Sequence, residues 1–176
     1  MTDSARILYA TDTLSTDDIH RRVPRHQQSI AASRLLKRLE GADFVPTARS
    51  KSHSRGVVAA AAGNTQGLLL GIDIEWMAPD RPFGAIARTV FASAPQRISI
   101  ADFYLGWTYF EAHYKAFQCF PSEASVHDVV AHTRDGIVLH LDDGTRVMQR
   151  CVADAFQLCV VWRDATRKID TLVDQT

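Results

Sequence analysis

The sequence GLLLGIDIE, residues 67–75, is an apolar run that ends in two carboxylates. Its length and the Gly-Asn pair shortly before it predict a buried strand after a turn, with another apolar strand over residues 56–62. Asp73 and Glu75 are two positions apart, so both side chains point to the same face of this strand. Because two neighbouring carboxylates repel each other and resist burial, they need water or a cation between them.

Two readings of this Asp-x-Glu pair stay open on the residues alone. Mg²⁺ is usually held by one or two carboxylates together with the phosphates of a substrate, which suits the pair. An exposed strand end would explain the same residues without any ligand. The pair gains meaning only from its neighbours in the sequence.

Apolar periodicity predicts three helices. A helix over residues 26–39 has one apolar face, a short helix covers residues 83–91, and a longer one covers residues 100–118. The expected core positions of the first helix are Ile30, Leu35, Leu36 and Leu39. Those of the long helix are Phe103, Trp107, Phe110, Tyr114 and Phe117.

The C-terminal part has the pattern of an antiparallel meander. The predicted strands cover residues 126–132, 136–141, 145–152 and 156–162. The polar end, from residue 163 onward, predicts a frayed segment or a short surface helix.

Two further polar groups are candidates for phosphate chemistry. In WTYFEAHYKAF, residues 107–117, Glu111 and Lys115 lie one helical turn apart, which fits either a surface ion pair or a third carboxylate with a charge for a phosphate. Ser52, His53 and Ser54, flanked by two cations, fit either a phosphate contact or an ordinary loop.

The composition excludes several classes of protein. The 176 residues carry 20 basic and 20 acidic side chains, so no net field indicates nucleic acid or a membrane surface, although basic residues crowd the first third. No apolar run reaches the roughly 20 residues that cross a bilayer. The three cysteines suggest neither a disulfide framework nor a zinc site. We expect a soluble, cytoplasmic monomer whose cysteines are reduced core residues.

In their order and spacing, these groups resemble the signature of the 4'-phosphopantetheinyl transferase superfamily, of the two-lobed, surfactin-synthetase-activating type. S-H-S is followed after about twenty residues by G-I-D-I-E, and after about thirty-five more by W-T-x-x-E-A-x-x-K-A. The resemblance runs from about Arg25 to Gln118 and includes I-A-R-x-x-F at residues 86–91. The chain looks like a compact and divergent member.

The resemblance implies an enzyme that moves 4'-phosphopantetheine from coenzyme A to a serine of an acyl or peptidyl carrier protein and releases 3',5'-ADP. It implies an α/β (α+β) fold with two similar lobes, each a helix on a small antiparallel sheet, related by pseudo-two-fold symmetry. The N-terminal lobe, residues 1–70, would bind the 3'-phosphate end of coenzyme A. The C-terminal lobe, residues 71–176, would hold the metal and the catalytic helix.

The resemblance also implies a role for each matching residue. The Mg²⁺ ligands would be Asp73, Glu75 and Glu111, with Glu111 also taking the proton of the carrier serine. Lys115 would stabilise the transition state. The contacts to coenzyme A would come from Ser52, His53, Lys51, Arg34 and Arg25.

Three departures from the family pattern favour a second hypothesis. Phe110 stands where the family has a lysine in W-[ST]-x-K-E, so Lys51, Arg55 or Arg88 would have to supply that charge. The family's G-K-P segment is absent, which predicts a shortened N-terminal lobe, and the residues after Gln118 differ from the usual turn. The alternative is a weakened homologue that binds coenzyme A or a carrier protein without transfer. A third hypothesis, an interaction domain with no ligand, gives the three carboxylates no role.

Overall fold

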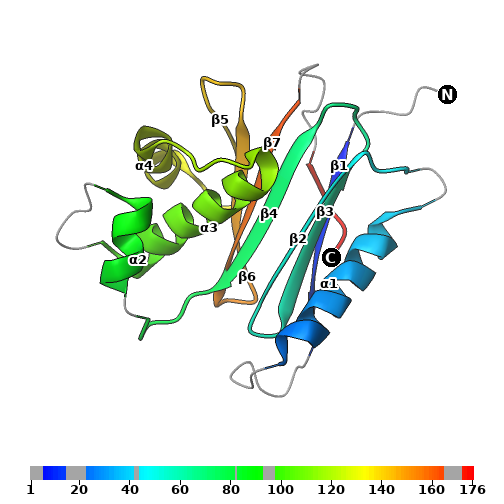
Figure 1. The fold of residues 1–176 in the computed structure, drawn as a ribbon, viewed down its shortest axis with the longest axis horizontal. Coiled ribbons are helices and arrows are strands. Elements are labelled where there is room, and N and C mark those ends of the chain that lie inside the picture. Colours follow the sequence, from blue (N-terminus) through cyan, green and yellow to red (C-terminus); the bar gives the residue numbers. More distant parts are fainter. Residues whose placement is uncertain (1–5, 15–22, 42–43, 82, 93–97, 165–171) are drawn as a thin grey trace.

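The computed structural model of the chain describes residues 6–14, 23–41, 44–81, 83–92, 98–164 and 172–176. These residues form a mixed α/β fold with four helices and two four-stranded sheets (Figure 1). The coarse prediction of an α+β protein built from helices on small sheets is confirmed.

The first sheet has the strand order β2-β3-β1-β8. Its strands are β1 (Ile7–Thr13), β2 (Ala48–Ser54), β3 (Val57–Gly63) and β8 (Leu172–Asp174). Neighbouring strands are antiparallel except β8, which is parallel to β1. One face of this sheet is covered by α1 (Arg25–Leu39), whose Ala32, Leu35 and Leu39 are buried against it.

The second sheet is antiparallel throughout, in the order β4-β7-β6-β5. Its strands are β4 (Leu69–Trp76), β5 (Val138–His140), β6 (Arg146–Val152) and β7 (Phe156–Arg163). The helices α3 (Ile100–Phe117) and α4 (Glu123–His132) cover one face of it, and α2 (Phe83–Val90) packs on α3. An apolar cluster shared by both sheets joins Tyr9 and Val57 to Ile72 and Trp162.

The edge strands β2 and β4 bring the two sheets together and run side by side (Figure 1). Serine side chains take the place of a backbone ladder between them. Ser50 Oγ accepts a hydrogen bond from the Ile72 amide at 3.0 Å, and Ser54 Oγ accepts one from the Trp76 amide at 3.1 Å. These hydroxyls satisfy backbone donors that an edge strand would otherwise leave free.

The three predicted helices and the last three strands of the meander are confirmed. The strand predicted at residues 126–132 is wrong, because these residues belong to α4. Ser122 caps that helix by accepting a hydrogen bond from the Ser125 amide, and Val126 and Val129 are buried at helical spacing. The run of β-branched residues was therefore a misleading signal.

The C-terminal end also differs from the prediction. Residues 172–174 form the strand β8, not a surface helix, while residues 165–171 lie outside the described part of the chain. Asp174 binds both Tyr9 of the first sheet and Arg150 of the second. The strand β1 was not predicted at all, although Ile7–Ala10 are buried.

Some expected core positions are exposed. Ile30 is 50% exposed and Tyr114 is 41% exposed, so these two predictions are wrong. Cys119 and Cys151 are exposed free thiols, and only Cys159 is a core residue. Periodicity placed the helices correctly, but it counted the exposed Ile30 and Tyr114 as core and missed buried positions of α3 such as Tyr104 and Tyr109.

Candidate functional site

A buried carboxylate lies where the two sheets meet. Asp73 on β4 is 4% exposed, and its Oδ1 atom accepts a hydrogen bond of 2.8 Å from Ser52 Oγ on β2. Ser52 is itself buried, at 8% exposure. The first residue of the S-H-S group therefore points at the aspartate of G-I-D-I-E and lies between the sheets.

Lys115 on α3 completes this contact. Its Nζ atom donates to Asp73 Oδ1 at 2.8 Å, to Ser52 Oγ at 3.0 Å and to the Ile72 carbonyl at 3.0 Å. An ammonium group has three hydrogens, so these acceptors satisfy it completely. Because Asp73 is buried, the charge of Lys115 offsets a desolvation cost that an isolated carboxylate would carry.

Gly71 explains how α3 comes so close to β4. It is in the same period-two row of β4 as Asp73 and Glu75, and its Cα faces the backbone of α3. A Cβ atom at this position would lie 1.9 Å from the Ala112 carbonyl oxygen and 2.9 Å from the Ala116 nitrogen. The glycine is thus needed for a close backbone approach, which brings Glu111 and Lys115 toward the carboxylates of β4.

Glu75 has the most perturbed carboxyl group of the predicted site. Burial, and next to it the charge of Asp73, raises its pKa from 4.5 to about 7. Arg81 Nη1 at 3.7 Å and a hydrogen bond of 3.2 Å from Ser54 Oγ oppose this shift without cancelling it. The side chain of Trp107 on α3 also lowers the pKa of Glu75.

The pKa of Glu111 is shifted by the same two causes as that of Glu75. Burial and the charge of Asp73 raise its pKa, and Lys115, one turn further along α3, lowers it. Asp73 therefore acts on both glutamates, which indicates that the three predicted metal ligands share one electrostatic environment.

One oxygen atom of Asp73 indicates that a cation would fit beside these residues. Asp73 Oδ2 is buried and has no hydrogen-bond partner among the described residues, although Oδ1 has two. A buried carboxylate oxygen without a partner costs free energy that a cation would relieve. Within the described part of the chain, no three acidic, histidine or cysteine side chains gather closely enough to hold a metal by themselves. One or two carboxylates with substrate phosphates suffice for Mg²⁺.

The predicted contacts to coenzyme A lie partly together. Burial lowers the pKa of His53, and the charges of Lys115, Arg25 and Lys51 lower it further, so four basic groups are close in space. Lys51 Nζ also donates to Ser33 Oγ at 2.6 Å. Arg34 is exposed on α1, and no interaction joins it to this basic group within the described residues.

Sequence reasoning missed Arg81, which lies beside Glu75. It did name Arg55, whose guanidinium lies 4.5 Å from the centre of the Trp76 ring. The alternating serines of β2 were a signal for the contact with β4, because Ser50, Ser52 and Ser54 share one face of a strand. The sequence analysis interpreted Ser52 and Ser54 instead as a phosphate contact or an ordinary loop.

Phe110, at the position of the family's lysine, is part of an aromatic stack. It is 6% exposed, with ring centres 6.2 Å from Trp107 and 4.4 Å from Phe120. Its neighbours are apolar and its place is in the cluster under α3. A cation at this position would have to leave that cluster to reach a phosphate.

Neither the known protein-family models nor the curated proteins include a match to this chain. Within the described residues, no helix is both long and apolar enough to cross a membrane. The motifs and the geometry of Asp73, Lys115 and their neighbours are therefore the observations that bear on function.

Proposed function

We propose that the chain is a phosphopantetheinyl transferase that moves 4'-phosphopantetheine from coenzyme A to a serine of an acyl or peptidyl carrier protein. The observation that carries this proposal is the contact between Lys115, Asp73 and Ser52. Each of these residues comes from a different motif, and the three motifs are far apart in the sequence. Their meeting at one buried carboxylate supports a common site.

The transfer forms a bond between the carrier serine oxygen and the phosphorus that bears pantetheine. The bond from that phosphorus to the bridging oxygen breaks, and 3',5'-ADP leaves with the electron pair. Glu111 takes the serine proton, directly or through water. Its raised pKa makes it a stronger base than a solvated glutamate, which suits this role.

Asp73, Glu75 and Glu111 would contribute to a Mg²⁺ site that the phosphate oxygens of the substrate complete, and the ion would neutralise charge on the pyrophosphate. Asp73 Oδ2 is available to such an ion because it has no hydrogen-bond partner among the described residues. Lys115 holds Asp73 in position and adds positive charge beside it. His53, Arg25 and Lys51 form the basic group for the 3'-phosphate of coenzyme A.

We also propose the two-lobed arrangement, with pseudo-two-fold symmetry and a boundary near residue 70. Packing of α1 on the first sheet and of α3 on the second is what such symmetry requires. The short strand β8 adds a C-terminal segment to the first sheet. A cytoplasmic monomer remains our expectation for the active form.

Phe110 favours the second candidate, a homologue that binds coenzyme A or a carrier protein without transfer. The missing lysine removes a charged contact of about 1.5 to 3 kcal/mol, and of more in a transition state. Such a loss corresponds to roughly ten-fold to several hundred-fold in rate. Phe110 is itself buried and stacked on Trp107 and Phe120, so this position supplies no charge.

The deciding experiment is mass spectrometry of apo-carrier proteins from the same genome, incubated with the chain, coenzyme A and Mg²⁺. We expect the mass of a phosphopantetheine arm to appear on a carrier serine, and to disappear with Asp73→Ala or Glu111→Ala. Asp154→Asn, an exposed acidic residue of the β6–β7 turn, is the matched control. If every carrier stays unmodified while coenzyme A binds in calorimetry, the second candidate replaces the first.

A further inference from the structure

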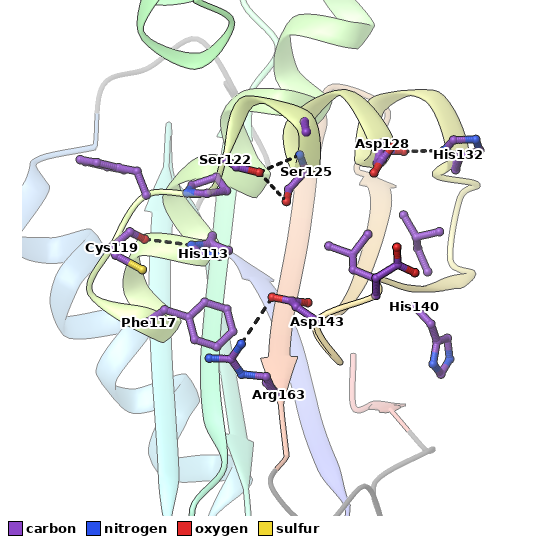
Figure 2. A pocket seen from close by; sticks show the side chains of 16 residues that line it. His113, Phe117, Cys119, Ser122, Ser125, Asp128, His132, His140, Asp143 and Arg163 are labelled. Atoms are coloured by element: carbon purple, nitrogen blue, oxygen red, sulfur yellow. Dashed lines mark hydrogen bonds and ion pairs between the residues drawn. The ribbon is translucent and has the colours of Figure 1, made fainter.

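A cavity of about 730 Å³ lies between the end of α3, the start of α4 and the turn between β5 and β6. Figure 2 shows its labelled side chains, with Ser125 and Asp128 on α4 above and Asp143 and Arg163 on the opposite wall. None of the residues assigned above to coenzyme A, Mg²⁺ or catalysis lines it. The cavity has the size of an ordinary small-molecule site.

Negative charge in this cavity exceeds positive charge. Three aspartates line it, and among the described residues only Asp143 has a cationic partner, Arg163, at 3.4 Å. The carboxylates of Asp128 and Asp142 form no ion pair and no hydrogen bond with any described residue. They are available to a ligand with positive charge.

His113 provides an independent polar group at the base of the cavity. It is 8% exposed, and its Nδ1 atom lies 2.9 Å from the Cys119 carbonyl oxygen, which can only accept, so Nδ1 carries the hydrogen. Burial lowers the pKa of His113 and favours the neutral ring. Nε2 is then an acceptor, and it has no partner among the described residues.

The walls also provide apolar contacts and a place for a cation. Leu139, Leu141 and Phe117 line the cavity. The guanidinium of Arg163 already lies 4.5 Å from the centre of the Phe117 ring. Arg163 thus contacts both an aromatic ring and a carboxylate of this cavity, and a bound organic cation would make the same kinds of contact.

We propose that this cavity binds a small organic cation, an ammonium or guanidinium group on an apolar body. The charged group would pair with the free carboxylates of Asp128 and Asp142, His113 Nε2 would be a separate acceptor in the same cavity, and the apolar body would pack on Phe117 and the leucines. A metal ion fits less well, because no three possible ligands among the described residues are close enough to share one. An anion would meet unpaired carboxylates.

The test uses three probes with the same six-carbon body and different head groups: hexylamine, hexanol and hexanoate. Each is titrated into the full chain while the NMR signals of the His113 imidazole and the Phe117 ring are followed. We expect saturable binding of hexylamine, weaker binding of hexanol and none of hexanoate. Added salt should weaken hexylamine binding and leave hexanol binding unchanged.

Asp128→Asn and Asp142→Asn should each weaken hexylamine binding by about five-fold, the effect of one partly exposed charge pair. Neither should change hexanol binding. Asp154→Asn is the matched control, because this aspartate is exposed and does not line the cavity. Both cavity aspartates are exposed, so their replacement should leave the fold intact.

Equal affinity for hexylamine and hexanol would overturn the proposal, as would unchanged hexylamine affinity in both aspartate variants. Absence of any saturable shift of His113 with all three probes would overturn it too. The experiment measures binding without a carrier protein or coenzyme A. Its result is therefore independent of the proposed transferase activity.

Discussion

The ammonium of Lys115 lies 2.8 Å from Asp73 Oδ1, although the two residues are 42 positions apart in the chain. This pair joins α3 to β4, and Ser52 adds β2 to the same contact. The side chain of Asp73 is 5% exposed and that of Lys115 is 29% exposed. Removing either partner of a charge pair this buried leaves the other charge unpaired and lowers the stability of the fold.

Lys115→Met should destabilise the fold by about 3 kcal/mol, because it leaves the Asp73 carboxylate buried without a cation. Urea unfolding would measure the change. Adding Asp73→Asn to this variant should restore part of the lost stability, since the unpaired charge is then gone. A double variant less stable than Lys115→Met would contradict this account.

The exposed pair of Arg38 and Asp12 is the control for this prediction. Its atoms are 2.6 Å apart, closer than those of Lys115 and Asp73, but the side chains are 64% and 47% exposed. Arg38→Met should therefore change the free energy of unfolding by less than about 1 kcal/mol. A comparable loss in both variants would show that burial is not the deciding factor.

Gly71→Ala should destabilise the chain by about 3 kcal/mol and impair any activity that needs Glu111. The new Cβ would meet the backbone of α3 at 1.9 Å, and a backbone atom cannot rotate away. Gly84→Ala on α2 is the control, because a Cβ there meets nothing within 4 Å and alanine favours a helix. Thermal unfolding would distinguish the two; equal effects would argue against a close approach at Gly71.

The raised pKa of Glu75 predicts a specific pH dependence of the free energy of unfolding. Its carboxyl group titrates near 4.5 when solvated and near 7 in the fold, so the folded chain keeps a proton that the unfolded chain loses between these values. Stability relative to Glu75→Gln should fall as the pH rises through this window, by up to about 3 kcal/mol, and stay level above it.

Chemical denaturation of both chains between pH 4 and pH 8 would measure this difference. Mg²⁺ added at pH 8 should stabilise the native chain more than Glu75→Gln, since the ion favours the ionised carboxylate. Glu40→Gln, at an exposed position, should leave the pH slope unchanged. A Glu75→Gln chain with the native pH slope would contradict the assignment.

The serines and the histidine of β2 should differ in effect. Ser50→Ala removes the acceptor of the Ile72 amide and should cost about 1 to 3 kcal/mol of stability, without changing the affinity for 3',5'-ADP. His53→Ala should leave stability nearly unchanged and weaken 3',5'-ADP binding by about ten-fold. Calorimetry and denaturation on both variants would show whether these roles are reversed.

Phe110→Lys, which restores the family's residue, should not restore or raise activity by itself. It would remove a ring stacked between Trp107 and Phe120 and place an ammonium in an apolar cluster. We expect a loss of about 3 kcal/mol or more of stability. Phe110→Leu is the control, because it removes the aromatic ring without adding a charge. A stable and more active lysine variant would show that the stack adapts.

Much of the fold could be predicted from local patterns. The long helix followed from aromatic residues at steps of three and four, and β6 and β7 from apolar runs between turns. The helix α4 could not, because its valines satisfy both strand propensity and helical spacing, and the Ser122 cap decides between them. The strand β8 has only three residues, too few for a pattern, and only its pairing with β1 makes it a strand.

By itself the sequence determined which residue types were present for the site and that Asp73 and Glu75 share a face, because strand periodicity is local. The tertiary structure alone decided that Lys115 and Ser52 both reach Asp73. It also decided that the serines of β2 bind β4 and that the ring of Phe110 stacks on Phe120, beyond the end of α3. Such contacts depend on how closely two sheets and a helix approach, which Gly71 permits but which no spacing within the chain could specify.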